Sequence, residues 1–450
     1  MAARWEAGES FWPGPARGGE CSGRCSQGRC RGLCRWSRRS PRCRSGDRRV
    51  FRSDTARRIG RSPAWERLRF VNILLRNQGD LSMAHPFLTR REFVASGVAV
   101  AAGAAGMQGT FTVAAGNPCC ADTSKILNYN PDMEYRRCGK TNLMVSAVCL
   151  GGHWKRVNTV VKGLFEGGNW LGGNFDDPAF IKNRTEVVSR CIERGINYID
   201  ACTGEEVVAY SRALKGRREK MYLGYSWYQN EVRFPQWRSF EKLKEGFDRG
   251  LKTAGLDYVD LWRITCHEQS GQHSDAEIEE LIKALDWAKK SGRARFTGIS
   301  SHDRPHIRKL IEKYPQQLEV IVTPYTARTK VIEDESGLWA AMKKMDVGWF
   351  GIKPFAGTSL FKGDSSPNSP HAEEDNRLAR LTLRYILCNP QITAPIPGLI
   401  TEAQVDNAAL AVKERRELDA QEKAELDRAM DRAWANLPYH YQWLKDWEYV

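Results

Sequence analysis

Polar side chains that could carry proton transfer recur where short apolar runs of this chain end. Asp200 and Cys202 close one run, and Thr265 and His267 follow the end of another. Carboxylate, imidazole, amine and phenol groups exchange protons, so these residue types at these positions offer general acid–base chemistry. Further candidates at comparable places are His153, Tyr225, Ser226, Cys266, Ser300, Ser301, His302, Thr323, Tyr325, Lys353 and Gly398. They span some 245 positions, so they can act together only if the fold gathers them.

Eight apolar runs alternate with amphipathic segments, a pattern typical of repeated strand–helix units and a parallel sheet. The expected strands are 145–150, 198–202, 221–227, 258–265, 296–301, 320–325, 349–354 and 393–398, and expected helices include 184–194, 239–254, 275–290, 304–314 and 373–387. Eight such units predict an α/β fold of the parallel (β/α)8 TIM barrel type, in which the ends of the strands share one rim. We expect the barrel over 133–415, a linker over 116–132, and a C-terminal helix and aromatic tail over 416–450, with a loop at 153–183 over the mouth and the tail capping the barrel.

Residues 1–82 differ in composition from everything that follows. They hold 19 Arg, no Lys and 7 acidic residues, a net charge of +12, whereas the other 368 residues carry only +3. The globular part is therefore near neutral, which argues against nucleic-acid binding by the folded domain. We expect 1–82 to be disordered or to be upstream sequence preceding a true start at Met83. Two alternatives stay open, an Arg-rich arm that binds nucleic acid and a zinc site at Cys21, Cys25, Cys30 and Cys34.

A twin-arginine export pattern follows Met83. Arg90 and Arg91 stand between a Thr and a Phe, an apolar stretch of small residues runs from 94 to 106, and 113–115 offers a cleavage site. The stretch is too short for a stable membrane span. The pattern predicts a signal peptide over 83–115, a mature chain from near Gly116, the twin-arginine export machinery as a partner and a bacterial periplasmic location. The alternative is an internal buried helix after a chance Arg pair.

Several segments resemble the aldo/keto reductases, in order, from about residue 134 to 426. They are 134–141, 145–146, 150–152, 197–200, 257–261, 298–302 and 396–398, followed by Gln404, Val405 and Asn407. The resemblance implies a TIM-barrel oxidoreductase that uses NADP or NAD to interconvert a carbonyl and an alcohol on a small molecule.

The family's catalytic Tyr, Lys, Asp and His are matched here only by Asp200. The positions of the other three carry Glu205, the pair 225–226 and Thr265. The resemblance therefore implies a degenerate site and slow reduction of ordinary aldehydes at best. We expect His267, one pleat beyond Thr265, to be the foremost substitute, with a rate that falls as pH rises through about 6.5. Lys353 and Tyr225 are the other catalytic candidates.

The resemblance also implies a cofactor site that has diverged. Ser300, Ser301 and Thr323 stand where the family holds the nicotinamide amide, and Ile352 where it often has an aromatic ring. The phosphate end would be formed by Gly398, Thr401, Gln404 and Asn407. Because 398–405 contains no Lys or Arg, we expect NADH and NADPH to bind with similar, modest affinity.

Two functions of other classes remain possible. One is an exported barrel that binds a small molecule or cofactor without catalysis. The other is a metal-dependent hydrolase or lyase with zinc ligands drawn from His153, Cys202, Cys266, His267 and His302. Eight Cys follow Gly116, including the neighbours Cys119 and Cys120, and their pairing cannot be read from the sequence.

Overall fold

The computed structural model describes residues 122–165, 170–329 and 337–447. All described residues belong to the second of the chain's two units, 110–450. The expectations for 1–82, for the twin-arginine segment, for the cleavage site and for Cys119 and Cys120 therefore fall outside the described residues.

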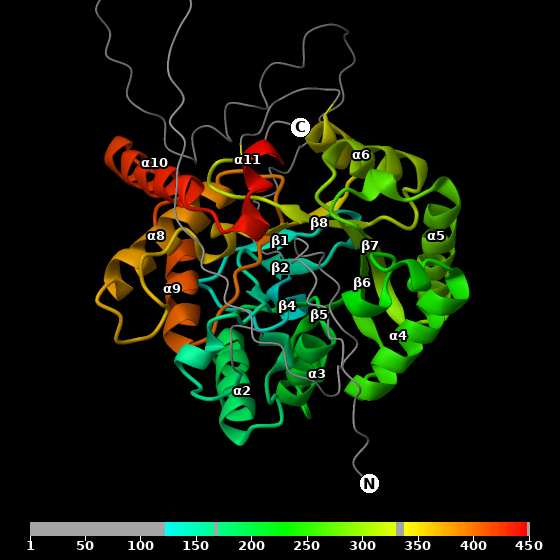
Figure 1. Cartoon of the computed structure of the whole chain (residues 1–450), viewed down its shortest axis with the longest axis horizontal. Coiled ribbons are helices and arrows are strands. Elements are labelled where there is room, and N and C mark those ends of the chain that lie inside the picture. Colours follow the sequence, from blue (N-terminus) through cyan, green and yellow to red (C-terminus); the bar gives the residue numbers. More distant parts are fainter. Residues whose placement is uncertain (1–121, 166–169, 330–336, 448–450) are drawn as a thin grey trace, which may run out of the picture. The chain divides into compact units, whose positions relative to one another are not determined.

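The centre of the second unit is an eight-stranded parallel sheet (Figure 1). Its strands are β3 (Leu150–Gly151), β4 (Tyr198–Ala201), β5 (Tyr222–Tyr225), β6 (Val259–Thr265), β7 (Ala294–Ser300), β8 (Val320–Pro324), β9 (Gly348–Ile352) and β10 (Ala394–Pro395). They lie in chain order, and Gly151 bridges in parallel to Gly398 beyond β10, with its N–H donating to the Pro397 carbonyl at 2.8 Å. The sheet therefore closes on itself, and the predicted TIM barrel is confirmed.

The first predicted strand, 145–150, was wrong in its first half. Met144–Ser146 (β2) pairs antiparallel with Tyr135–Arg137 (β1) in a hairpin, and only Leu150–Gly151 joins the barrel. The chain turns through Gly139 and Asn142, both at positive φ, which reverses its direction before β2. A Cβ on Gly139 would lie 2.3 Å from the Gly348 backbone nitrogen, so the hairpin closes the end of the barrel where β9 begins.

Helices cover the outside of the barrel. They are α2 (Pro178–Glu193), α3 (Gly204–Ala213), α4 (Phe240–Ala254), α5 (Asp275–Lys290), α6 (Arg304–Lys313), α7 (Leu338–Lys344), α8 (Ala372–Leu387), α9 (Glu402–Lys413) and α10 (Ala420–Ala435), while the short α11 (Leu444–Trp447) belongs to the C-terminal tail. Local signals set several ends: Ser274 and Glu277 form a capping box at the start of α5, and Gly255 ends α4 in the left-handed conformation. The sequence did not predict α3 or α7.

The apolar core has two main layers. One fills the space between strands and helices, where Trp262 stacks on Phe247 at 4.0 Å and Trp349 on Trp339 at 4.2 Å. The other plugs the barrel interior near the hairpin, where Tyr198 stacks on Phe350 at 4.3 Å. The interior is thus packed at the end where the strands begin, which leaves the other end for a site.

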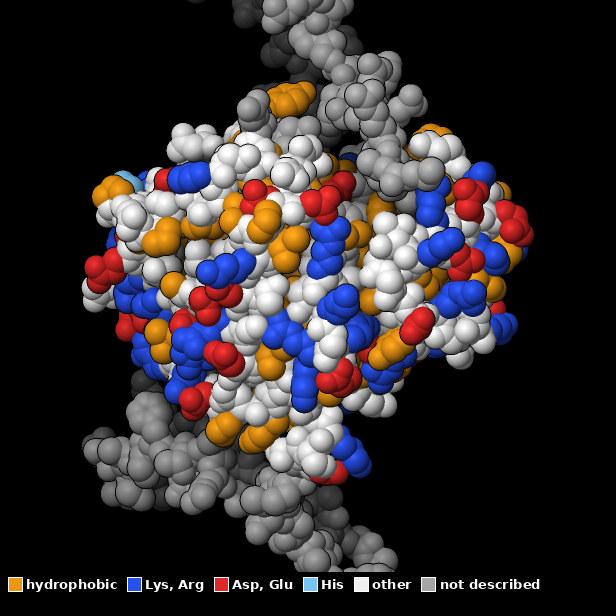
Figure 2. All heavy atoms as spheres, turned by 90° about the horizontal axis from the view of Figure 1, so that it is seen from below, with side chains coloured by type: hydrophobic (Ala, Val, Ile, Leu, Met, Phe, Trp, Pro, Cys, Tyr) orange, Lys and Arg blue, Asp and Glu red, His pale blue; other side chains and the backbone are white. Residues whose placement is uncertain are grey.

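The surface carries both signs of charge. On the face shown in Figure 2, Lys and Arg side chains are interspersed with Asp and Glu, as expected from the small net charge beyond residue 82. Within 122–165, 170–329 and 337–447, the helices are all too short or too polar to cross a bilayer.

Candidate active site

A cavity of about 540 Å³ lies at the C-terminal ends of the strands, a size typical of small-molecule sites. Its walls come from nearly every strand end and from the loops beyond them. The residues that reach it include Gly152, His153, Lys155, Arg156, Asp200, Cys202, Glu206, Arg233, Arg263, Thr265, Glu268, Ser300, Lys353, Gly398 and Tyr441. The barrel has therefore gathered side chains that lie up to 288 positions apart.

Asp200 holds an arginine at the base of this cavity. The Arg263 guanidinium donates to Asp200 through Nε at 2.9 Å and through Nη2, and both side chains are almost fully buried. Burial alone would lower the pKa of Arg263, but the Asp200 carboxylate keeps it above its usual value. Arg263 also donates to the Thr265 hydroxyl at 3.0 Å. In the family, the corresponding aspartate holds a lysine from the strand equivalent to β5. Here Asp200 instead holds Arg263, which comes from β6.

Thr265 links this pair to a second buried carboxylate. Its hydroxyl lies 2.8 Å from that of Ser226, which donates to Glu231 at 2.6 Å, and Glu231 also accepts the Thr265 backbone N–H at 2.7 Å. Burial raises the pKa of Glu231 despite these hydrogen bonds. The positions of the family's Lys and His are therefore joined by one hydrogen-bonded chain that fixes the Thr265 hydroxyl at the cavity wall.

The region of the family's Tyr is occupied by an acid and a histidine. Helix α3 starts at Gly204, and the carboxylate of Glu206 accepts the Cys202 N–H at 2.6 Å and lies 2.8 Å from His153 Nδ1. Although burial opposes ionisation, His153 and these N–H groups hold the pKa of Glu206 below its usual value. A Cβ on Gly152 would lie 2.0 Å from the Glu206 carboxyl carbon, so this approach requires glycine.

Lys353 extends into the cavity from the end of β9. Its backbone lies in the left-handed region, with φ 59°, which is uncommon for a residue with a side chain. Burial lowers the pKa of Lys353 to about 8. Strain of this kind persists where the surrounding structure enforces it and is concentrated at functional sites.

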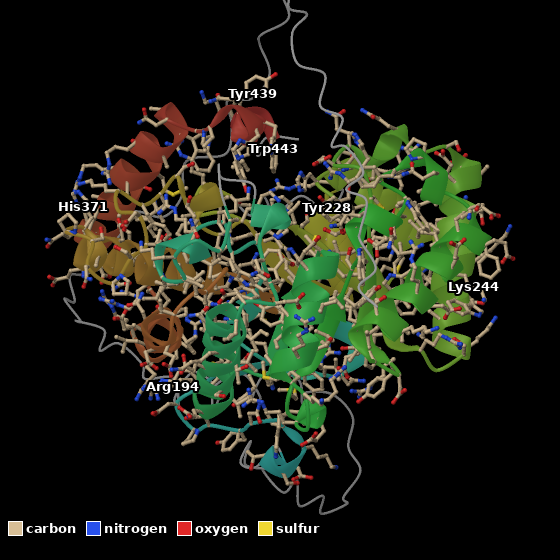
Figure 3. All side chains as sticks on the ribbon, turned by 60° about the horizontal axis from the view of Figure 1, so that its bottom comes forward. Arg194, Tyr228, Lys244, His371, Tyr439 and Trp443 are labelled. Carbon is tan, nitrogen blue, oxygen red and sulfur yellow. The ribbon has the colours of Figure 1, made fainter. Side chains whose placement is uncertain are left out.

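The C-terminal tail lies over the same rim. Tyr441 packs against Gly357 and lines the cavity, and the Trp443 ring stacks on His302 at 4.3 Å. In Figure 3, Tyr439 and Trp443 both belong to this tail, and Tyr439 is 91% exposed. The Lys353 amine lies 5.7 Å from the centre of the Trp443 ring, a cation–π arrangement.

Two of the predicted catalytic residues lie outside the cavity. Tyr225 faces the helices, where its ring packs edge-on against Phe247 at 5.1 Å, because successive strand residues point to opposite sides. His267 is also absent from the cavity wall. Strand β6 ends at Thr265, so the expected further pleat does not form, and His267 Nδ1 instead accepts the Gln269 N–H at 3.2 Å.

The expected nicotinamide contacts are only partly assembled. Ser300 lines the cavity, but Ser301 donates its hydroxyl to the Glu268 carbonyl at 3.1 Å, within the loop beyond β6. Thr323 is buried on the other side of β8, since its neighbour Val322 faces the cavity. Ser301 and Thr323 were therefore wrong as cavity residues.

The expected phosphate end lies at the opposite side of the cavity, where Gly398, Thr401, Gln404 and Asn407 all reach it. Thr401 caps α9, whose first N–H groups have no partner within the helix and suit an anion.

The segment 398–405 contains no Lys or Arg, but another loop supplies a cation to the cavity. Arg156 reaches the cavity and donates to the Gly363 carbonyl at 2.7 Å and to the Ser365 hydroxyl at 2.9 Å. The Ser365 carbonyl in turn lies 3.5 Å from the Gln404 side-chain nitrogen. Arg156 therefore weakens the expectation that NADH and NADPH bind equally, which rested on the lack of a cation in 398–405 alone.

The residues present fit a nicotinamide dinucleotide at its phosphate half. The start of α9, Gln404 and Arg156 would hold the phosphates. At the nicotinamide half, Ser300 alone of the three expected contacts is available, and Ile352 lines the wall in place of an aromatic ring.

The described residues do not form the zinc site that was considered at the ends of the strands. His153, Cys202, Cys266, His267 and His302 all lie in the described part of the chain, and no three His, Cys, Asp or Glu side chains there are placed to share a metal ion. Six of the eight Cys beyond Gly116 are described, and all six are free thiols.

Comparison with known proteins agrees with this architecture. The sequence model described as "Aldo/keto reductase family" matches residues 167–431, more than half of the chain. The chain is 23% identical to L-galactose dehydrogenase of Arabidopsis thaliana over 306 residues, 64% of this chain and 90% of that protein. It is 22% identical to L-glyceraldehyde 3-phosphate reductase of Escherichia coli strain K12, covering 62% of this chain and 74% of that protein.

Among solved structures, the holo form of an aldo-keto reductase from Bacillus halodurans aligns with a TM-score of 0.48 at 22% identity, over 69% of this chain and 99% of that one. From the match of the family model, the chain belongs to the aldo/keto reductase family and is an oxidoreductase of that type.

Proposed function

We propose that this protein is an exported NAD(P)-dependent oxidoreductase that interconverts a carbonyl and an alcohol on a small molecule, with Lys353 as the proton donor in place of the family's Tyr. One observation carries the proposal. Lys353 reaches the cavity that also contains Asp200, Thr265 and Ser300, and in the described chain it has no salt bridge to a carboxylate. Its amine is thus available to a ligand.

The cofactor supplies a hydride when bound, and the chain's own groups manage the rest. The Ser226 hydroxyl gives its one proton to Glu231, so the Thr265 hydroxyl donates to Ser226, accepts from Arg263 and fixes the shape of the cavity wall beside the substrate. The Asp200–Arg263 pair keeps this side of the cavity polar and rigid. Tyr441 and Trp443 lie over the rim and reduce the access of water.

Lys353 has the acidity that this role requires. A general acid is most effective when its pKa lies near the working pH, and burial lowers the pKa of this amine to about 8. The ammonium form predominates at neutral pH and is lost as pH rises through 8. Reduction should therefore slow above pH 8, whereas alcohol oxidation, which needs the neutral amine, should accelerate.

The test compares Lys353→Met with the parent, measuring NADPH oxidation with 4-nitrobenzaldehyde and 4-oxobutanoate between pH 5 and 10. General acid catalysis is typically worth about 10²- to 10⁴-fold, so the variant's kcat should fall by that amount and lose the decline above pH 8. His267→Ala is the matched control, and its rate should equal that of the parent, because His267 does not reach the cavity.

Two results would overturn the proposal. A Lys353→Met enzyme as active as the parent would remove Lys353 from the chemistry. NADPH binding without turnover of either aldehyde at any pH would instead favour the non-catalytic binding barrel.

Export to the periplasm by the twin-arginine route is part of the same proposal, and it rests on the sequence pattern at Arg90 and Arg91. That route carries proteins that are already folded, which suits an enzyme that must acquire a cytoplasmic dinucleotide before it leaves.

A further inference from the structure

The carboxylates that face the cavity already have ion-pair or hydrogen-bond partners. Asp200 pairs with Arg263, and Glu268 pairs with Arg233 at 2.5 Å. Glu206 lies against His153 and accepts two backbone N–H groups. The fourth, Asp375, accepts the backbone N–H groups of residues 362 and 363 at 2.9 and 2.8 Å. Asp375 acts electrostatically on Arg156, and none of the four forms a salt bridge with Lys155 or Lys353.

Two lysines in the same cavity have no such partner. In the part of the chain that the structure describes, Lys155 and Lys353 form no salt bridge, and their amines lie over aromatic rings of the tail instead. The Lys155 amine is 5.4 Å from the centre of the Tyr441 ring, and the Lys353 amine is 5.7 Å from that of Trp443. Five Lys or Arg and four Asp or Glu line the cavity, so its formal charge is positive.

The charge of Lys155 also acts on Lys353. Burial lowers the pKa of Lys353 most, the Glu268 carboxylate partly opposes this, and the charge of Lys155 adds to the lowering, whereas burial alone lowers the pKa of Lys155. Two like charges with reduced access to water are unfavourable, and an anion placed between them relieves both costs. The aromatic rings supply only weak compensation by comparison.

We propose that the substrate of this oxidoreductase carries an anionic group, a carboxylate or a phosphate, which Lys155 binds beneath Tyr441 while the reacting carbonyl faces Lys353. This proposal rests on the function proposed above. A lysine can bind either group, because its ammonium is a compact charge that donates hydrogen bonds to a carboxylate or a phosphate.

The phosphates of the cofactor are the competing explanation for these cations. Arg156 and the start of α9 lie around Ser365 and Gln404, whereas Lys155 and Lys353 lie around Tyr441 and Trp443. The two sets of contacts are different, so the dinucleotide and a separate anion would be bound together.

The first arm measures turnover. We compare kcat/KM for 4-oxobutanoate with that for its methyl ester, and for glycolaldehyde phosphate with that for glycolaldehyde, each with saturating NADPH. The anion should be preferred at least tenfold in one of the two pairs, and that pair identifies the group. Lys155→Met should lower this preference at least tenfold, Lys155→Arg should retain most of it, and the control Lys290→Met, a solvent-exposed lysine of α5, should leave it unchanged.

The second arm does not depend on activity. Calorimetry with succinate and with glycerol 1-phosphate, each with saturating NADP⁺, should show binding of at least one anion that weakens at least tenfold in Lys155→Met. Such binding without turnover would support the anion site while refuting the reductase function. Loss of anion binding when NADP⁺ is added, or equal kcat/KM for both members of each pair, would overturn the anion site.

Discussion

The buried pair of Asp200 and Arg263 gives the most direct prediction about stability. Their side chains are only 4% and 2% exposed, and Arg263 contacts both carboxylate oxygens. Removing one partner leaves an uncompensated buried charge, which typically costs about 3–5 kcal/mol, whereas replacing both partners is often nearly neutral. We therefore expect Arg263→Met and Asp200→Asn each to lower the free energy of unfolding by about 3–5 kcal/mol.

The double variant decides between a charge-pair effect and simple loss of packing. Asp200→Asn with Arg263→Met should cost less than either single change, because no charge then remains buried. The assay is urea unfolding followed by both tryptophan fluorescence and circular dichroism, whose coincidence would justify a two-state free energy. Single variants that lose less than about 1 kcal/mol, or a double variant that loses the sum of the two, would refute the reasoning.

Three further predictions concern the cofactor, the tail and processing. Arg156→Ala should weaken NADPH binding, measured by fluorescence titration, about 10-fold or more, since a hydrogen bond to a charged group contributes about 1.5–3 kcal/mol; unchanged affinity would exclude Arg156 from the phosphate site. Trp443→Ala should expose Lys353, raise its pKa from about 8 and move the alkaline decline in reduction to higher pH; an unmoved midpoint would contradict burial as the cause. Mass spectrometry of the native protein should find no peptide from 1–82 and a mature end near Gly116, and abundant Arg-rich peptides would show that translation starts upstream.

The alternation of apolar runs with amphipathic segments was enough to predict the barrel and most of its helices. Helix α5 was placed correctly at both ends, and Ser274 caps its start in the structure. Helix α3 was missed because its segment was compared with the family only at Glu205, the position of the catalytic Tyr, so the burial of Glu206 was missed with it.

The candidate site was predicted in part, and the errors share a cause. Asp200 and Ser300 were placed correctly at the cavity, since each lies in the last two residues of its strand. His267 and Tyr225 were misplaced because one or two residues of strand length decide which way a side chain points. Arg263 could have been found from its spacing, since it precedes Thr265 by two and must share its face.

The strands that close the barrel are paired over fewer residues than the central strands. Strands β6 and β7 share six register positions, whereas β3 and β10 contain two residues each and meet through the Gly151–Gly398 bridge. Amide hydrogens at this junction should exchange with solvent earlier than those of the central strands. His153 and the start of α9 lie on opposite sides of the junction. A ligand that contacts both would therefore hold the two ends of the sheet together. Its binding would raise resistance to unfolding in proportion to the logarithm of its concentration, so thermal stability becomes a measure of occupancy.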